Sequence, residues 1–333
     1  MDKHEQLGPW IRRFLLEHLI RDRNLSPNTQ RSYRDTLAML VPFIAALVHK
    51  PLDRLELVDL SAAHARLFLA HLEQARRVTV ATRNQRLAAI HSLARFIAES
   101  SPQHVAWYGE LRNVRFKKTI RGLVPYLDKP EVEALLAVPD CATSVGRRNY
   151  VLLLFLYNSG ARASEAANLC IADLDLDTGA PRASVRILGK GGRIRRCPLW
   201  EKTALHLAQL VQGRPPTERV FLNRRREPLT RFGIYALIRM CVARAGRSMP
   251  SLLSKRVSPH TLRHSTATHL LRAGVDINTI RSWLGHVSLD TTQVYAEIDL
   301  EMKARALEKC NTPDAKKPTL ASDGTLMAFL RAI

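Results

Sequence analysis

The sequence lacks the patterns that mark membrane, secreted and disulfide-bonded proteins. Its most apolar run, Tyr150 to Tyr157, is far shorter than the roughly 20 residues that a helix needs to cross a bilayer. The first residues carry no apolar stretch of the kind found in secretory signals. The five cysteines are odd in number and widely spaced, which argues against a disulfide framework and against a Cys-X-X-Cys metal site. We therefore expect a cytoplasmic protein with reduced thiols and no membrane partner.

Glycine-rich nucleotide-binding motifs are missing as well. The Gly189–Gly192 turn lacks the GxxxxGK(S/T) spacing of a P-loop, and the last glycine of a GxGxxG pattern would fall at Ile194. No internal repeat or low-complexity tract is visible. The chain of 333 residues is long enough for two compact domains, because one core typically serves about 100 to 200 residues.

Acidic side chains are scarce relative to basic ones. The sequence has 51 Lys and Arg against 30 Asp and Glu, a net charge of +21 and a pI near 10.5. Residues 1–118 hold 19 basic and 11 acidic side chains, and the remainder holds 32 and 19, so the excess runs through the whole chain. Such a balance favours a polyanionic partner through release of condensed counterions. Composition alone would also suit a ribosomal or membrane-surface protein.

The N-terminal third has the pattern of a small helical domain. Ser26, Ser61 and Thr79 are each typical helix N-caps and precede apolar residues at helical spacing, and Trp10 to Ile20 has the same spacing. We therefore predict about four helices around one core. Arginines with few acidic neighbours lie on the predicted outer faces, and we interpret them as contacts to DNA phosphates: Arg31, Arg34, Arg83 and Arg86. For any single arginine, a solvated helix face is the more common explanation.

Residues 112–124 contain no acidic residue and show no clear period. We interpret them as a basic linker between two domains, with Arg115, Lys117 and Lys118 along a phosphate backbone. A merely solvated hinge explains the composition equally well.

The second domain is predicted to be mainly helical with a small sheet. Asp128 to Glu131 has the form of a capping box, and Gly160 suits the left-handed end of an apolar helix. Residues 183–188 and 193–199 are predicted to pair as a β-hairpin with Lys190 at its tip. Residues 220–223 are a candidate third strand.

Several polar residues of this domain suit binding or cleavage of a phosphodiester. Arg162, near a helix start, can offer a fork of donors to phosphate oxygens. His260 and Arg263 share one face of the first turn of a helix that begins at Ser258–Pro259, where an anion is favoured. The ammonium group of Lys190 can protonate a leaving alkoxide. Taken alone, Arg162 and Lys190 are each more often ordinary surface.

A zinc site at His260 and His264 is disfavoured. The pair is spaced i, i+4, but no glutamate lies between the two histidines as in HExxH, and no third ligand is obvious. Nearby arginines would also repel a cation. We expect no metal and no cofactor.

His286 and Tyr295 are nine residues apart, so one continuous helix would point them to opposite sides. Gly285 can end a helix over 277–284, and Asp290 can cap a new one. The break allows both side chains to face one cleft, although a lone tyrosine at an amphipathic position is usually part of a core.

Order and spacing of these segments together resemble the tyrosine recombinase or phage integrase family, including its Xer-type members. The resemblance covers residues 125–300, and Leu25 to Tyr33 is similar to the family's core-binding domain. Ala161 departs from the leucine that is common at this place. Six residues match the family's catalytic positions: Arg162, Lys190, His260, Arg263, His286 and Tyr295.

The resemblance implies a C-shaped clamp of an all-helical DNA-binding domain and a mainly helical catalytic domain with a small antiparallel β-sheet. The expected segments are 1–111, the linker 112–124, the catalytic domain 125–300 and a tail 301–333 with an exchange helix. Tyr295 would attack DNA to leave a 3′-phosphotyrosyl enzyme. Arg162, Arg263 and His286 would stabilise the oxyanion, while Lys190 and His260 would transfer protons.

The implied partners are double-stranded DNA with inverted half-sites and three further copies of the chain, joined through the C-terminal segment in a nucleoid-associated tetramer. We expect a recombinase of a mobile genetic element. A type IB topoisomerase, a chromosome-dimer resolvase and a non-catalytic DNA-binding regulator stay as alternatives.

Overall fold

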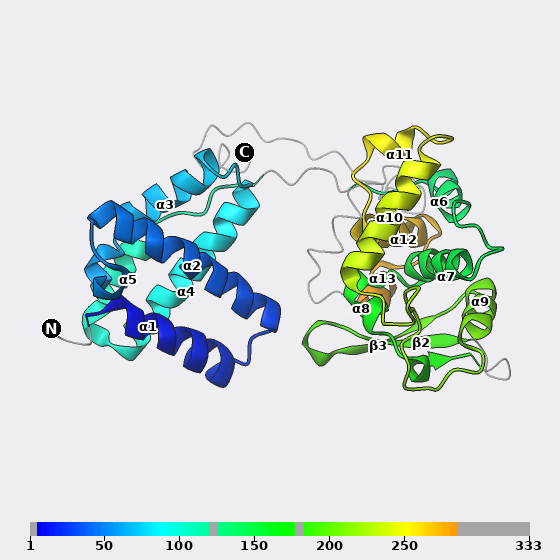
Figure 1. Cartoon of the computed structure of the whole chain (residues 1–333), viewed down its shortest axis with the longest axis horizontal. Helices are drawn as coiled ribbons and strands as arrows, with labels where there is room; N and C mark the ends of the chain where they lie inside the picture. The colour runs from blue at the N-terminus through cyan, green and yellow to red at the C-terminus, as the bar shows by residue number, and fades with distance from the viewer. Residues whose placement is uncertain (1–4, 120–124, 177–182, 286–333) are drawn as a thin grey trace, which may run out of the picture. The chain divides into compact units, whose positions relative to one another are not determined.

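The computed structural model describes residues 5–119, 125–176 and 183–285, which belong to two compact units that divide between Gly122 and Leu123 (Figure 1). Both units are built mainly of helices, and the second also contains a small antiparallel sheet. The predicted fold class is therefore confirmed, whereas the C-shaped arrangement of the two domains stays a prediction. Within the described residues, no helix combines the length and the apolar character that a bilayer crossing requires.

The first unit contains five α-helices among its described residues. They are α1 (Leu7–Arg13), which continues as a π-helical segment (Phe14–Asp22), α2 (Pro27–Val48), α3 (Ala62–Gln74), α4 (Val80–Ser100) and α5 (Val105–Arg112). The N-caps predicted at Ser26, Ser61 and Thr79 are confirmed, because each side chain accepts a hydrogen bond from the amide three residues ahead. Helix α5 was not predicted, and its N-cap His104 makes no capping hydrogen bond through its side chain.

The core of this unit forms around α4, which packs against α2, α3 and α5. The apolar stripe predicted for α4 is confirmed, since Leu87, Ile90, Leu93 and Ile97 are fully buried. Burial of such a stripe is what holds helices of this length together.

The described start of the predicted linker lies along α4. Arg83 Nη1 donates to the Arg115 carbonyl at 3.0 Å, and Asn84 Nδ2 donates to the Lys117 carbonyl at 2.8 Å. The Lys117 amide returns a hydrogen bond to Asn84 Oδ1 at 3.0 Å. Residues 115–117 thus have a fixed backbone path and belong structurally to the first unit.

The second unit combines helices with a three-stranded sheet. Its helices are α6 (Lys129–Leu136), α7 (Ser144–Ser159), α8 (Ala163–Asn168), α9 (Glu201–Val211), α10 (Arg231–Ala245), α11 (Ser251–Ser254), α12 (Pro259–Arg272) and α13 (Ile277–Leu284). The strands are β1 (Leu174–Asp175), β2 (Ser184–Leu188) and β3 (Ile194–Pro198), in the antiparallel order β1-β2-β3. The central helix α7 packs against α9 and α12, and its residues 151–156 are all buried.

The predicted hairpin is confirmed, but the predicted third strand at residues 220–223 is wrong. The third strand is β1, and Leu222 makes only an isolated bridge to Pro228. Proline has no amide hydrogen, so a regular ladder cannot extend through that pair. Val220 and Phe221 are buried, which explains why the segment has the apolar composition of a strand.

Candidate active site

Arg162 is the N-cap of α8, directly after the turn that ends α7. Gly160 ends α7 with φ +58°, as predicted for a left-handed C-cap. The Arg162 amide donates to Glu165 Oε2 at 2.9 Å, and its Nη1 donates to Oε1 at 2.6 Å. The Arg162 side chain keeps 32% of its surface exposed, against 5% for Glu165. Glu165 therefore orients a guanidinium group that is still open to a ligand.

The charge of Glu165 is fixed by its two arginine partners. Burial by itself would raise the pKa of this carboxyl, but the hydrogen bond and charge of Arg195, followed by the backbone and side-chain hydrogen bonds from Arg162, hold its pKa below the usual value. Glu165 is therefore an anion at neutral pH, which is the state that orients guanidinium groups.

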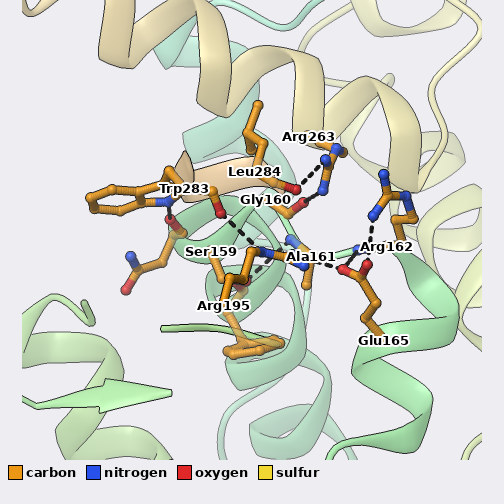
Figure 2. A network of polar contacts seen from close by, with 11 residues as sticks. Ser159, Gly160, Ala161, Arg162, Glu165, Arg195, Arg263, Trp283 and Leu284 are labelled. Carbon is orange, nitrogen blue, oxygen red and sulfur yellow. Dashed lines mark hydrogen bonds and ion pairs between the residues drawn. The ribbon is translucent and has the colours of Figure 1, made fainter. Parts of the chain in front are cut away.

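Arg263 lies on α12 and is almost completely buried, with 3% of its surface exposed. Its Nη1 donates to the Gly160 carbonyl at 2.6 Å, and its Nη2 donates to the Leu284 carbonyl. Figure 2 shows the guanidinium group facing these two carbonyls. Arg263 thus joins the ends of α7 and α13, two carbonyl-rich helix termini that favour a cation.

His260 lies one turn before Arg263 on α12, whose predicted start at Ser258–Pro259 is confirmed. Loss of hydration around its ring, and then the positive charges of Arg263 and Arg162, lower the pKa of His260. The ring is therefore neutral at pH 7 and able to accept a proton.

His260 and Arg162 line one concave surface together with residues of α10. The cavity has a volume of about 540 Å³, and its charged lining consists of Arg162, Arg231 and Arg239, beside the neutral ring of His260. Two aromatic side chains of α10, Phe232 and Tyr235, complete its wall. A cavity with this lining suits an anion that carries apolar groups, such as a segment of nucleic acid.

Lys190 lies at the tip of the β2–β3 hairpin, as predicted. The backbone forms a short turn over Lys190–Gly192, and the Gly189 amide donates to the Arg193 carbonyl at 2.7 Å. Gly191 and Gly192 both have φ +75°, a conformation that favours glycine. The side chain of Lys190 lies outside what the structure describes.

Two predicted catalytic residues, His286 and Tyr295, lie outside the described residues, as does the tail 301–333. The predicted end of α13 is confirmed, because Gly285 adopts a left-handed C-cap with φ +65°. His286 follows this residue directly in the sequence.

Sequence reasoning missed Arg195, which lies on β3 with 9% of its side chain exposed. Its Nε donates to the Trp283 carbonyl at 2.9 Å, and its Nη2 donates to Glu165 Oε2 at 2.7 Å (Figure 2). The alternation of the strand carries a signal for it: Cys197, two residues further on, is buried, so Arg195 shares the inward face. An inward arginine requires a buried acceptor.

The arginines of the first unit differ from one another. Arg31 and Arg34 are exposed on α2, and Arg34 pairs with Asp35 at 2.8 Å. Arg83 and Arg86 do not face outward as expected, and this expectation is corrected. Arg83 is 7% exposed and bonded to the Arg115 carbonyl, while Arg86 Nη1 donates to the Ser32 carbonyl and Thr36 Oγ1.

The reason for this difference is that helix periodicity does not identify which polar side chains bridge to a neighbouring helix.

Of the predicted linker contacts, Arg115, Lys117 and Lys118 are exposed. Lys117 already pairs with Glu73 at 2.8 Å.

Comparison with known proteins agrees with the geometry. Residues 125–302 match the phage integrase family, and residues 11–100 match the N-terminal SAM-like domain of phage integrases. The chain is 38% identical over 335 residues to y4rC of Sinorhizobium fredii, named as an integrase/recombinase, with 100% of both chains covered. It is 32% identical over 316 residues to the tyrosine recombinase XerC of Pelobacter propionicus, covering 92% of this chain and 96% of that protein.

Solved structures share the fold. A XerH site-specific recombinase bound to a palindromic difH substrate matches with a TM-score of 0.67 at 22% identity, over 86% of this chain and 81% of that one. The Tn1549 transposon integrase with transposon right end DNA matches with a TM-score of 0.66 at 17% identity, over 89% and 98%. Family models match both units, and a curated relative matches over the full length. This chain therefore belongs to the phage integrase family and is a tyrosine-type site-specific DNA recombinase.

Proposed function

We propose that this recombinase cuts and rejoins double-stranded DNA through a covalent bond between Tyr295 and a 3′ phosphate. The observation that carries the proposal is the hydrogen bond from Arg263 to the Leu284 carbonyl. It anchors the end of α13 beside the turn that bears Arg162. Tyr295 is ten residues beyond Gly285, so the chain cannot carry it farther than about 35 Å from this anchor.

Each group has one step in the reaction. The Tyr295 oxygen attacks phosphorus and forms the new P–O bond, while the bond to the 5′ oxygen breaks. The neutral ring of His260 receives the tyrosine proton, and Lys190 gives a proton to the 5′ oxygen. Arg162, Arg263 and His286 stabilise the charge on the phosphorane oxygens. The energy of the phosphodiester stays in the phosphotyrosyl bond, so religation needs no nucleotide.

The DNA is expected to carry inverted half-sites, each bound by one protomer of a tetramer. We favour a mobile genetic element as the biological setting, because the relative that matches the full length is named as an integrase/recombinase. Resolution of chromosome dimers is the second candidate, supported by relatives named XerC and XerD.

The test is covalent capture on genomic DNA from the source of the protein. Wild-type protein should form an SDS-stable adduct whose ends map to a defined site. Tyr295→Phe removes the nucleophilic oxygen and almost no volume, so it should form no adduct and keep wild-type DNA affinity. Tyr108→Phe, in the first unit, is the matched control and should form adducts normally. An adduct with the Tyr295→Phe variant would refute the assignment of the nucleophile.

The mapped site then separates recombination from relaxation. A plasmid with two directly repeated copies should lose the intervening segment as a circle. Relaxed topoisomers without deletion would indicate a type IB topoisomerase, and binding without any adduct would indicate a non-catalytic regulator.

A further inference from the structure

Arg195 is bonded in two directions. Its Nε holds the carbonyl of Trp283, in the last turn of α13, and its Nη2 holds the carboxylate that orients Arg162. Its two partners come from α8 and α13, which are far apart in sequence from each other and from β3 (Figure 2). The side chain of Arg195 therefore connects Arg162 to the end of α13, which is followed in the sequence by His286.

Packing around Arg195 leaves it little freedom. A Cβ added to Gly285 would lie 3.1 Å from Arg195 Cδ, and one added to Gly189 would lie 3.6 Å from its Nη1. Gly189 precedes Lys190 at the tip of the hairpin. The missing Cβ of Gly285 thus makes room for this arginine, whereas a Cβ at Gly189 would be in ordinary van der Waals contact with it.

We propose that Arg195 is a positioning residue for DNA cleavage, which fixes the Arg162–Glu165 pair and the end of α13 relative to each other. The proposal rests on the proposed function, because it is through Arg162 and the residues after Gly285 that Arg195 affects the reaction.

A purely stabilising role does not account for this arrangement. Removing an arginine and a carboxylate from water is costly, and apolar side chains of similar volume often stabilise a core as well or better. The fork of the guanidinium group reaches two acceptors in fixed directions, which an ammonium group does not do. Precise relative placement of two catalytic segments is what this geometry provides.

The experiment compares Arg195→Gln and Arg195→Lys with Arg196→Gln. Arg196 is the neighbouring arginine on β3, has 73% of its side chain exposed and lies 3.9 Å from Asp175. Two quantities are measured on the full chain. One is hydrogen–deuterium exchange of the last turn of α13, with α12 as internal reference, and the other is the single-turnover rate of adduct formation at saturating DNA.

Arg195→Gln should speed exchange at the end of α13 and lower the cleavage rate by about tenfold to 100-fold, with the DNA dissociation constant and exchange in α12 unchanged. Arg195→Lys keeps the charge beside Glu165 but loses the Nε donor, so its rate should fall between those of wild type and Arg195→Gln. Arg196→Gln should match the wild type in both measurements.

Three results would overturn the proposal: unchanged exchange at α13, wild-type cleavage despite faster exchange, or exchange that rises equally in α12, which would show general loss of structure. The exchange measurement needs no catalysis. If the wild type forms no adduct, the proposed function fails, and the exchange data still show whether Arg195 fixes α13.

Discussion

Gly160 shows how strongly a single residue of the site is constrained. It has φ +58°, and a Cβ there would lie 2.4 Å from Leu284 Cδ2. Gly160→Ala therefore combines backbone strain with displacement of the buried Leu284 side chain. Gly213 is the matched control, since it has φ +73° and no atom within 4 Å of its added Cβ.

We expect Gly213→Ala to lower the free energy of unfolding by about 1 kcal/mol, and Gly160→Ala by about 2 kcal/mol more. Urea unfolding measures both values. Equal losses in the two variants would mean that the contact with Leu284 has no energetic weight.

His264 gives the site a pH-dependent stability. Burial, and then the charges of His260 and Arg263, lower its pKa to about 4. The folded pKa is below the unfolded value of about 6.5, so the unfolded chain binds the proton more tightly, and stability falls as pH drops from about 6.5 to 4. This group should contribute a loss of about 2 kcal/mol between pH 7 and pH 5.

The measurement is urea unfolding of wild type and His264→Gln at both pH values. The wild type should lose more stability than the variant, because glutamine does not titrate. A variant that loses as much as the wild type would show that other groups carry the pH dependence.

Prediction from sequence succeeded at single residues where the chemistry is local. The left-handed turns at Gly160 and Gly285 and the position of Lys190 at a hairpin tip follow from neighbouring residues alone. By contrast, the hydrogen bond between Arg195 and Glu165 joins residues that are 30 positions apart in sequence. The bond from Arg195 to Trp283 spans 88 residues. No local pattern specifies which acceptor a buried arginine will meet.

The same distinction holds for whole elements. Helices α2, α3 and α4 were predicted from an N-cap and an apolar stripe, both of which are encoded within the helix. Strand β1 has two residues and is defined by its partner β2, so its own sequence carries almost no signal. Segment 220–223 has the apolar composition of a strand because it is buried, but a buried segment need not form a ladder of hydrogen bonds with a neighbouring strand.

The contact between α2 and α4 provides a prediction at this scale. Arg31 is exposed on α2, whereas Arg86 of α4 bonds the Ser32 carbonyl and Thr36 Oγ1 of α2 at 3.1 and 3.0 Å. Arg31→Ala should reduce the slope of log affinity against log salt by about one, because one phosphate contact is lost. Its stability should not change.

Arg86→Ala should lower the free energy of unfolding by about 1 to 3 kcal/mol, since it leaves part-buried acceptors without a donor. Its salt slope should equal that of the wild type. Titrations of DNA at several salt concentrations, together with urea unfolding, measure both effects. If Arg86→Ala reduced the salt slope and Arg31→Ala lowered the free energy of unfolding instead, Arg86 would belong to the DNA-binding surface and Arg31 would not.

At the scale of the whole molecule, the net positive charge is what we expect of a member of a DNA recombinase family. Both units carry a positive excess, which is expected of two domains that bind the same duplex. Each unit matches a separate domain of phage integrases.

We expect assembly of protomers on DNA to depend on the tail after Tyr295. Residues 301–333 lie outside the described part, but Leu326, Phe329, Leu330 and Ile333 are spaced i, i+3, i+4 and i+7. A helix this short needs a surface on which to bury its apolar stripe, and the family resemblance implies a neighbouring protomer. Deletion of residues 320–333 should preserve binding to a single site and impair pairing of two sites and recombination.

Phe329→Asp should reproduce the deletion, because it places a charge on the apolar stripe. Ala328→Asp is the control, since Ala328 would fall on the opposite face of the predicted helix, so this variant should leave pairing intact. Pairing is measured by fluorescence transfer between two labelled sites as protein concentration rises. If the truncated protein pairs sites at the wild-type concentration, the tail is not the assembly element. If truncation lowers single-site binding or stability instead, the stripe packs on its own catalytic domain.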